Sequence, residues 1–130
     1  MSEKIISLDP GNILKGRRGC LLSVQQQLIG NHFWVKRNPP WAAVFDTLAL
    51  PQFRDQEREQ LMEHVDLEQR QIDWEGIHQV GKSFSKEPRV LLRVAHALYN
   101  GGDCQLSELK GLSSAGRSAA ILLIAQRYRE

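Results

Sequence analysis

Residues Gly76 to Ser83 carry the most specific chemical motif of the chain. The octet GIHQVGKS matches the phosphate-loop pattern G-x-x-x-x-G-K-[ST], in which Lys82 would reach the outer phosphates and Ser83 would hold magnesium. A phosphate loop must leave a buried strand, whereas residues 68–75 are mostly polar. The context therefore favours two helical turns with Gly81 at a close packing point, and nucleotide binding at Gly76–Ser83 is the less favoured alternative.

Other catalytic and metal-binding patterns are incomplete in this sequence. Glu75 and His78 have the i, i+3 spacing of one half of a di-iron site, but the sequence holds no second Glu-x-x-His pair. Ser113 and Ser114 do not fit the G-x-S-x-G pattern of a hydrolase and are better explained as a helix cap. We therefore predict that the protein is not an enzyme and has no catalytic residue, no metal site and no cofactor.

Basic residues near the N-terminus form a candidate surface for an anionic partner. Glycines flank the first group of cations, and Phe33 and Trp34 precede the second, which is typical of surfaces that bind single-stranded nucleic acid. The net charge of +2 is modest for a dedicated nucleic-acid-binding domain. Binding of the phosphate backbone is therefore the alternative function, and its candidate residues are Lys15, Arg17, Arg18, Lys36 and Arg37.

The sequence contains more large aromatic residues than the buried face of one amphipathic helix would accommodate. An apolar surplus of this kind can form the centre of a protein-binding surface. The candidate residues for partner binding are Phe33, Trp34, Phe53 and Trp74. The leading hypothesis is a small, non-catalytic protein-interaction or accessory module that binds another protein or a second copy of itself.

The elements that must position these residues show helical spacing. Leu21, Val24 and Leu28 indicate a helix that ends at Gly30, and the run 32–35 is ambiguous between a short strand and a helical turn. Further helices are expected over 40–50, 52–65, 74–84 and 88–99, followed by a short turn at 106–112 and a last helix from 114.

Caps and breakers mark several of the expected helix boundaries. Residues 38–40, Asn-Pro-Pro, indicate a turn with a proline suited to the first turn of a helix, and Pro51 closes that helix. Asp73 can cap the helix that follows it. Residues 100–102, Asn-Gly-Gly, are expected to end the preceding helix with a residue in the left-handed backbone conformation. Residues 119–125 are apolar nearly all round, which predicts a central last helix.

Length and composition agree with one helical domain. The chain has 130 residues, of which 42% are hydrophobic and 25% charged, so we expect one globular domain over residues 1–130. The predicted fold is an all-α compact bundle of five or six helices with a short irregular or extended N-terminal segment, the basic residues 1–19. The predicted core residues are Trp41, Val44, Phe45, Leu48, Leu91, Val94, Leu98, Ile121, Leu122 and Ile124.

Charge and cysteine usage bear on the compartment and the partners. Residues 1–40 sum to +4, residues 41–80 to −6 and residues 81–130 to +4, so basic ends flank an acidic middle. The two cysteines, Cys20 and Cys104, are far apart and are expected to be free thiols. The sequence shows neither a signal-peptide pattern nor an apolar run long enough for a bilayer. A cytoplasmic protein without membrane contact is expected.

Overall fold

The computed structural model describes residues 24–101 and 106–128. Within these ranges the chain is helical apart from one two-stranded hairpin, which confirms the predicted all-α class. The predicted irregular segment 1–19 and both cysteines lie outside the described residues. After a helical stretch at 24–29, the elements are η2 (Phe33–Arg37), α2 (Pro39–Leu48), α3 (Asp55–Met62), β1 (Val65–Asp66), β2 (Gln71–Ile72), α4 (Trp74–Gly81), α5 (Lys86–Asn100), η3 (Leu106–Gly111) and α6 (Ser114–Arg127).

Side chains at the predicted boundaries cap three of the helices. The Asn38 side-chain oxygen accepts a hydrogen bond from the Trp41 amide at 3.4 Å, where α2 begins. Asp73 accepts one from the Gly76 amide at 3.1 Å, and this bond holds the pKa of Asp73 below its ordinary value. Ser113 caps α6 through the Gly116 amide, also at 3.1 Å. Each cap satisfies an N–H that the first helical turn leaves without a partner.

A short hairpin connects α3 to α4, largely in the stretch 66–73, where the sequence predicted no helix or strand. Val65 pairs with Ile72 and Asp66 with Gln71 in an antiparallel register. The Asp73 amide then donates to the His64 carbonyl at 2.8 Å. Strands of two residues are too short to show the alternation of apolar and polar residues by which a strand is recognised. The hairpin was therefore not predictable from periodicity.

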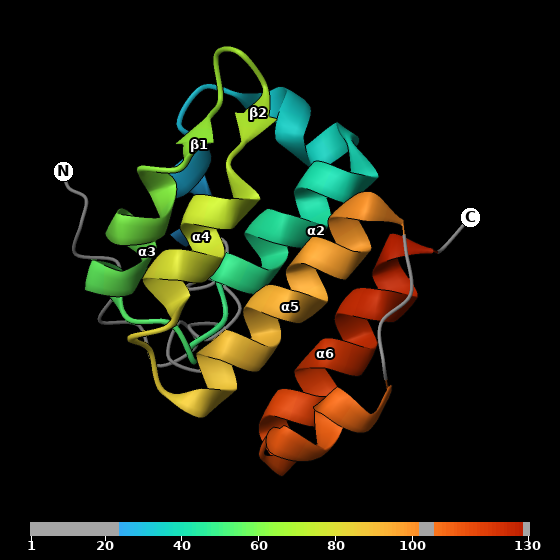
Figure 1. The fold of residues 1–130 in the computed structure, drawn as a ribbon. Helices are drawn as coiled ribbons and strands as arrows, with labels where there is room; N and C mark the ends of the chain where they lie inside the picture. The colour runs from blue at the N-terminus through green and yellow to red at the C-terminus, as the bar shows by residue number, and fades with distance from the viewer. Residues whose placement is uncertain (1–23, 102–105, 129–130) are drawn as a thin grey trace, which may run out of the picture.

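Helix α5 lies at the centre of the described fold. It packs against α2, α4 and α6, while α6 lies at the outer edge of the bundle (Figure 1). The expectation of a central last helix is therefore wrong. Among the described elements, α2, α5 and η3 contact α6. The buried residues of α6 are Gly116, Ala120 and Leu123, which follow one another at i, i+4 and i+7.

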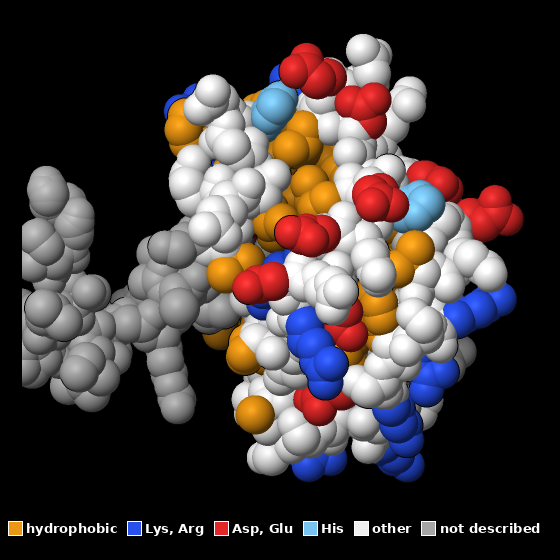
Figure 2. All heavy atoms as spheres, turned by 90° about the vertical axis from the view of Figure 1, so that its left-hand side faces the viewer, with side chains coloured by type: hydrophobic (Ala, Val, Ile, Leu, Met, Phe, Trp, Pro, Cys, Tyr) orange, Lys and Arg blue, Asp and Glu red, His pale blue; other side chains and the backbone are white. Residues whose placement is uncertain are grey.

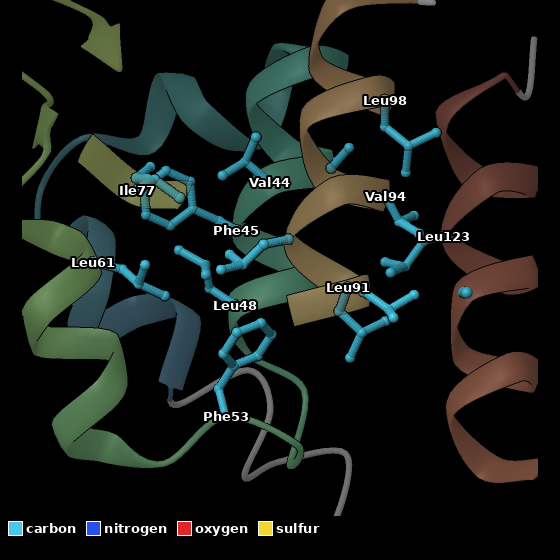
Figure 3. Close-up of a cluster of buried hydrophobic side chains, with 14 of the residues drawn as sticks. Val44, Phe45, Leu48, Phe53, Leu61, Ile77, Leu91, Val94, Leu98 and Leu123 are labelled. Atoms are coloured by element: carbon cyan, nitrogen blue, oxygen red, sulfur yellow. The ribbon is translucent and has the colours of Figure 1, made fainter. Parts of the chain in front are cut away.

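The core confirms most of the predicted buried residues. Aliphatic and aromatic side chains from α2 and α5 interdigitate with Leu61 of α3 and Ile77 of α4 (Figure 3). Seven predicted core residues are buried: Trp41, Val44, Phe45, Leu48, Leu91, Val94 and Leu98. Ile124 is partly buried. Ile121 and Leu122 are each 58% exposed, so both predictions are wrong, because these two residues lie on the outer side of α6.

One buried cation joins α3 to the end of α2. The Arg58 side chain is 7% exposed and donates to the Leu48 carbonyl at 2.6 Å and to the Leu50 carbonyl at 2.8 Å. It also donates to the Ala49 carbonyl at 3.5 Å and to the Asp55 carboxylate at 2.7 Å. Carbonyls at a helix C-terminus lack partners within the helix and attract positive charge. Arg58 therefore closes α2 and fixes the turn to α3.

None of the helices in the described part of the chain is both long enough and apolar enough to cross a membrane.

Candidate binding surfaces

The phosphate-loop motif is folded as a helix. Residues Trp74–Gly81 form α4, and a Cβ atom on Gly81 would lie 2.7 Å from Cδ1 of Leu92 on α5. The Ser83 hydroxyl donates to the Val80 carbonyl at 3.0 Å. The backbone amides of this segment thus lie in helical turns and do not form a loop around phosphates. Gly81 is a close packing point between α4 and α5, as the sequence context predicted.

The structure describes two of the five predicted anion-binding residues. Lys36 and Arg37 are exposed in the last turn of η2, whereas the predictions for Lys15, Arg17 and Arg18 fall outside the described residues. Lys36 shares a groove with Asp46 of α2. Burial raises the pKa of the Asp46 carboxyl.

The four predicted partner-binding aromatics have different environments. Phe33 is 51% exposed, and Trp34 and Trp74 are half-buried. Phe53 is 2% exposed and packs into the core near Leu48 (Figure 3), because the turn after α2 directs its ring inward. Phe53 therefore cannot contribute to a partner surface, and that prediction is corrected.

The two partly exposed tryptophans belong to a chain of aromatic contacts. The Trp34 ring meets that of buried Trp41 edge-on, with centroids 4.9 Å apart, and Trp41 contacts Tyr99 at 5.9 Å. Tyr99 lies 5.5 Å from Trp74, which in turn stacks on His96 at 4.3 Å with nearly parallel planes. These contacts tie η2, α2, α4 and α5 together. Trp34 and Trp74 therefore contribute to packing.

The outward side of α6 exposes two large aliphatic side chains. Ile121 and Leu122 are each 58% exposed, and Tyr128, directly after the helix, is 50% exposed. Ala115 and Ala125 are also exposed and lie on the same side by helical spacing. We call this set, Ala115, Ile121, Leu122 and Ala125, the α6 outer face. Sequence reasoning missed it because the apolar run 119–125 does not show which side the core covers.

The described residues contain no group of three or more His, Cys, Asp or Glu side chains placed to hold a metal ion. Glu75 is exposed, and His78 instead hydrogen-bonds to His96, with His78 Nε2 2.8 Å from His96 Nδ1.

Comparison with known proteins gives no relative for this arrangement: no protein-family model, no curated protein and no solved structure matches the chain.

Proposed function

We propose that this chain is a non-catalytic helical interaction module that binds another protein through the α6 outer face. The observation that carries the proposal is the pair of adjacent large aliphatic side chains, Ile121 and Leu122, each with more than half of its surface open to solvent. Contiguous apolar side chains on the surface of a small fold are typical of protein-binding sites. The cytoplasmic location expected from the sequence is part of the same proposal.

The charges of α6 favour a partner with an acidic rim. The helix carries Arg117 and Arg127 and no acidic residue between Ser114 and Arg127. Arg127 donates to the Leu98 carbonyl of α5 at 2.9 Å, so its side chain lies on the α5 side of the helix and Arg117 is the cation near the outer face. An acidic rim complements the exposed Arg117 and steers association, while an apolar centre covers Ile121 and Leu122. A second copy of the chain would bring like charges together at this face.

The expected contribution of the aliphatic pair is large enough to measure. Complete burial of a leucine or isoleucine side chain contributes about 1.5–3 kcal/mol, so covering the exposed half of both contributes about 2 kcal/mol. A loss of that size weakens binding by about 30-fold. Introducing a charge at the centre of the interface adds a desolvation cost to this loss.

The test compares Leu122→Asp with a matched control. The partner is first isolated with the full chain from the cells that make it, and the dissociation constant is then measured with purified proteins. Leu122→Asp removes about half of that contribution, about 1 kcal/mol, and the buried charge adds a desolvation cost of at least about 1 kcal/mol, so binding should weaken by at least about 30-fold. Gln79→Asp, which introduces the same charge at an exposed position on α4, should leave the affinity unchanged. Equal affinities for Leu122→Asp and the unaltered chain would refute the proposal.

A second candidate function is binding of a nucleic-acid backbone near η2. It is favoured by the exposed Phe33 next to the exposed cations Lys36 and Arg37. Backbone binding predicts that affinity for a single-stranded oligonucleotide falls steeply with salt. Replacing both cations by alanine should reduce the affinity and the salt slope together, and an unchanged slope would refute this candidate.

A further inference from the structure

We propose that His78 of α4 and His96 of α5 together bind a divalent transition-metal ion that prefers right angles between its ligands, such as Ni²⁺ or Cu²⁺. The facing ring nitrogens, His78 Nε2 and His96 Nδ1, are 2.8 Å apart, and imidazole nitrogen is a common ligand of these ions. The sequence pattern did not indicate this pair, because 18 residues separate the two histidines. The site uses no residue of the α6 outer face.

The spacing of the two nitrogens fits one shared ion. Two nitrogens that each lie about 2.0 Å from a metal, at a right angle to each other, are about 2.8 Å apart, whereas in a tetrahedral zinc site the separation is about 3.3 Å. The observed 2.8 Å therefore matches the right-angled geometry of Ni²⁺ or Cu²⁺. A hydrogen bond directs the two nitrogens along the line that joins them, whereas a shared ion lies beside that line. Binding therefore turns the rings toward the ion.

Each imidazole stays neutral when the ion binds. In the hydrogen bond, one of the two facing nitrogens carries the proton that the other accepts. The ion needs a lone pair on both, so this proton is lost to water and the far nitrogen of the same ring takes up another. Burial lowers the pKa of both imidazoles, and the charges of His96 and Arg93 lower the pKa of His78 further. Neither ring therefore has to lose a positive charge near neutral pH before it binds the ion.

The surroundings hold one ring and leave room for the other ligands of the ion. Trp74 stacks on the His96 ring, with centroids 4.3 Å apart and planes 4° apart, so His78 makes most of the movement. Both histidines line a groove of about 540 Å³ between α4 and α5. Water in this groove can fill the remaining coordination positions.

The expected affinity is moderate. Two protein ligands make an open site, and the charge of Arg93, which disfavours a protonated His78, also disfavours a bound cation. The packing of α4 on α5 acts in the opposite direction, because it keeps the second imidazole beside the first and so raises its local concentration. Either imidazole alone should therefore bind the ion much more weakly than the pair.

Carboxylates on the surface offer a competing kind of cation site. In Figure 2, many of the Asp and Glu side chains lie in the upper half of the view. The other two histidines of the chain each lie beside one carboxylate. His32 Nε2 is 3.7 Å from Glu68, and His64 Nδ1 is 3.3 Å from Asp73. His32 and His64 are therefore the matched controls for His78 and His96.

Calorimetric titration of the full chain with Ni²⁺ at neutral pH tests the proposal. Ni²⁺ is the probe because, unlike Cu²⁺, it does not oxidise thiols, and the chain has two cysteines. It should bind with a dissociation constant below about 100 μM. In NMR spectra of the unaltered chain, the imidazole signals of His78 and His96 should shift or broaden at lower Ni²⁺ concentrations than those of His32 and His64. Weaker binding than this limit, or earlier changes at His32 and His64, would overturn the proposal.

Matched double variants separate the paired site from general attraction of cations. His78→Gln with His96→Gln should weaken Ni²⁺ binding by at least about tenfold, and His32→Gln with His64→Gln should change it less than about twofold. Mg²⁺, which prefers oxygen ligands, should not compete for the site. Equal losses in the two variants, or competition by Mg²⁺, would overturn the proposal. If a variant fails to fold, the NMR titration of the unaltered chain decides. Ni²⁺ can bind here whether or not Leu122→Asp alters partner binding, so the two proposals fail separately.

Discussion

Two adjacent leucines in α6 should respond very differently to the same substitution. Leu123 is 5% exposed and packs into the core, whereas its neighbour Leu122 is 58% exposed. Leu123→Ala removes buried methyl and methylene groups and leaves a cavity, so we expect a loss of about 3 kcal/mol in the free energy of unfolding. Leu122→Ala changes a solvent-facing side chain, and alanine is the better helix former, so we expect a change within about 0.5 kcal/mol.

Urea and thermal unfolding of the two variants measure this difference. The unfolding entropy of a 130-residue chain is about 0.27 kcal/mol/K, so Leu123→Ala should lower the Tm by about 10 °C. The Tm of Leu122→Ala should stay within about 2 °C of the unaltered chain. If the Tm fell equally in both variants, or fell more in Leu122→Ala, Leu122 rather than Leu123 would face the core. The α6 outer face would then not exist.

Three further predictions concern contacts between elements, and urea unfolding checks each. Arg58→Ala should lower the free energy of unfolding by about 3 kcal/mol, because carbonyls at the end of α2 lose a charged donor, and Arg58→Lys should lower it less. A decrease of less than about 1 kcal/mol for Arg58→Ala would contradict the role of Arg58 in closing α2. Gly81→Ala should destabilise by about 1–2 kcal/mol although alanine favours helices, because its Cβ would press on Leu92, and a gain in stability would contradict the close packing of α4 on α5. Burial lowers the pKa of His78 and His96 in the folded chain below the ordinary value of about 6.5 that both have in the unfolded chain. As the pH falls below about 6.5, the unfolded state therefore binds protons more readily than the folded state, and the free energy of unfolding decreases. Replacing both histidines by glutamine should reduce that fall, and an unchanged pH profile would show that other groups cause it.

The sequence predicted the helices well because their signals are local. The stripe Trp41, Val44 and Leu48 and the caps at Asp73 and Ser113 depend on residues within one or two turns, and the structure confirms them. The helical reading of Gly76–Ser83 likewise followed from the polar residues before it. In each case the decisive interactions lie close together in the chain.

The errors concern which side of an element the rest of the chain covers. Nothing local distinguishes Leu122 from Leu123 in an apolar run, since the choice depends on where α2 and α5 pack. Phe53 was misplaced for the same reason, because its burial depends on the course of the turn after α2. The contact between His78 and His96 was also not predictable, since the two rings meet only when α4 packs on α5.

The most direct test of the proposed partner surface is site-specific photo-crosslinking in the cells that make this protein. A photoreactive amino acid is placed at position 122 on the α6 outer face or, as a control, at the exposed Gln79 of α4. The account predicts a covalent adduct with one other protein from position 122, no such adduct from position 79, and loss of the adduct when Ile121 is changed to aspartate. Equal adducts from both positions, or an adduct only with a second copy of the chain, would contradict it.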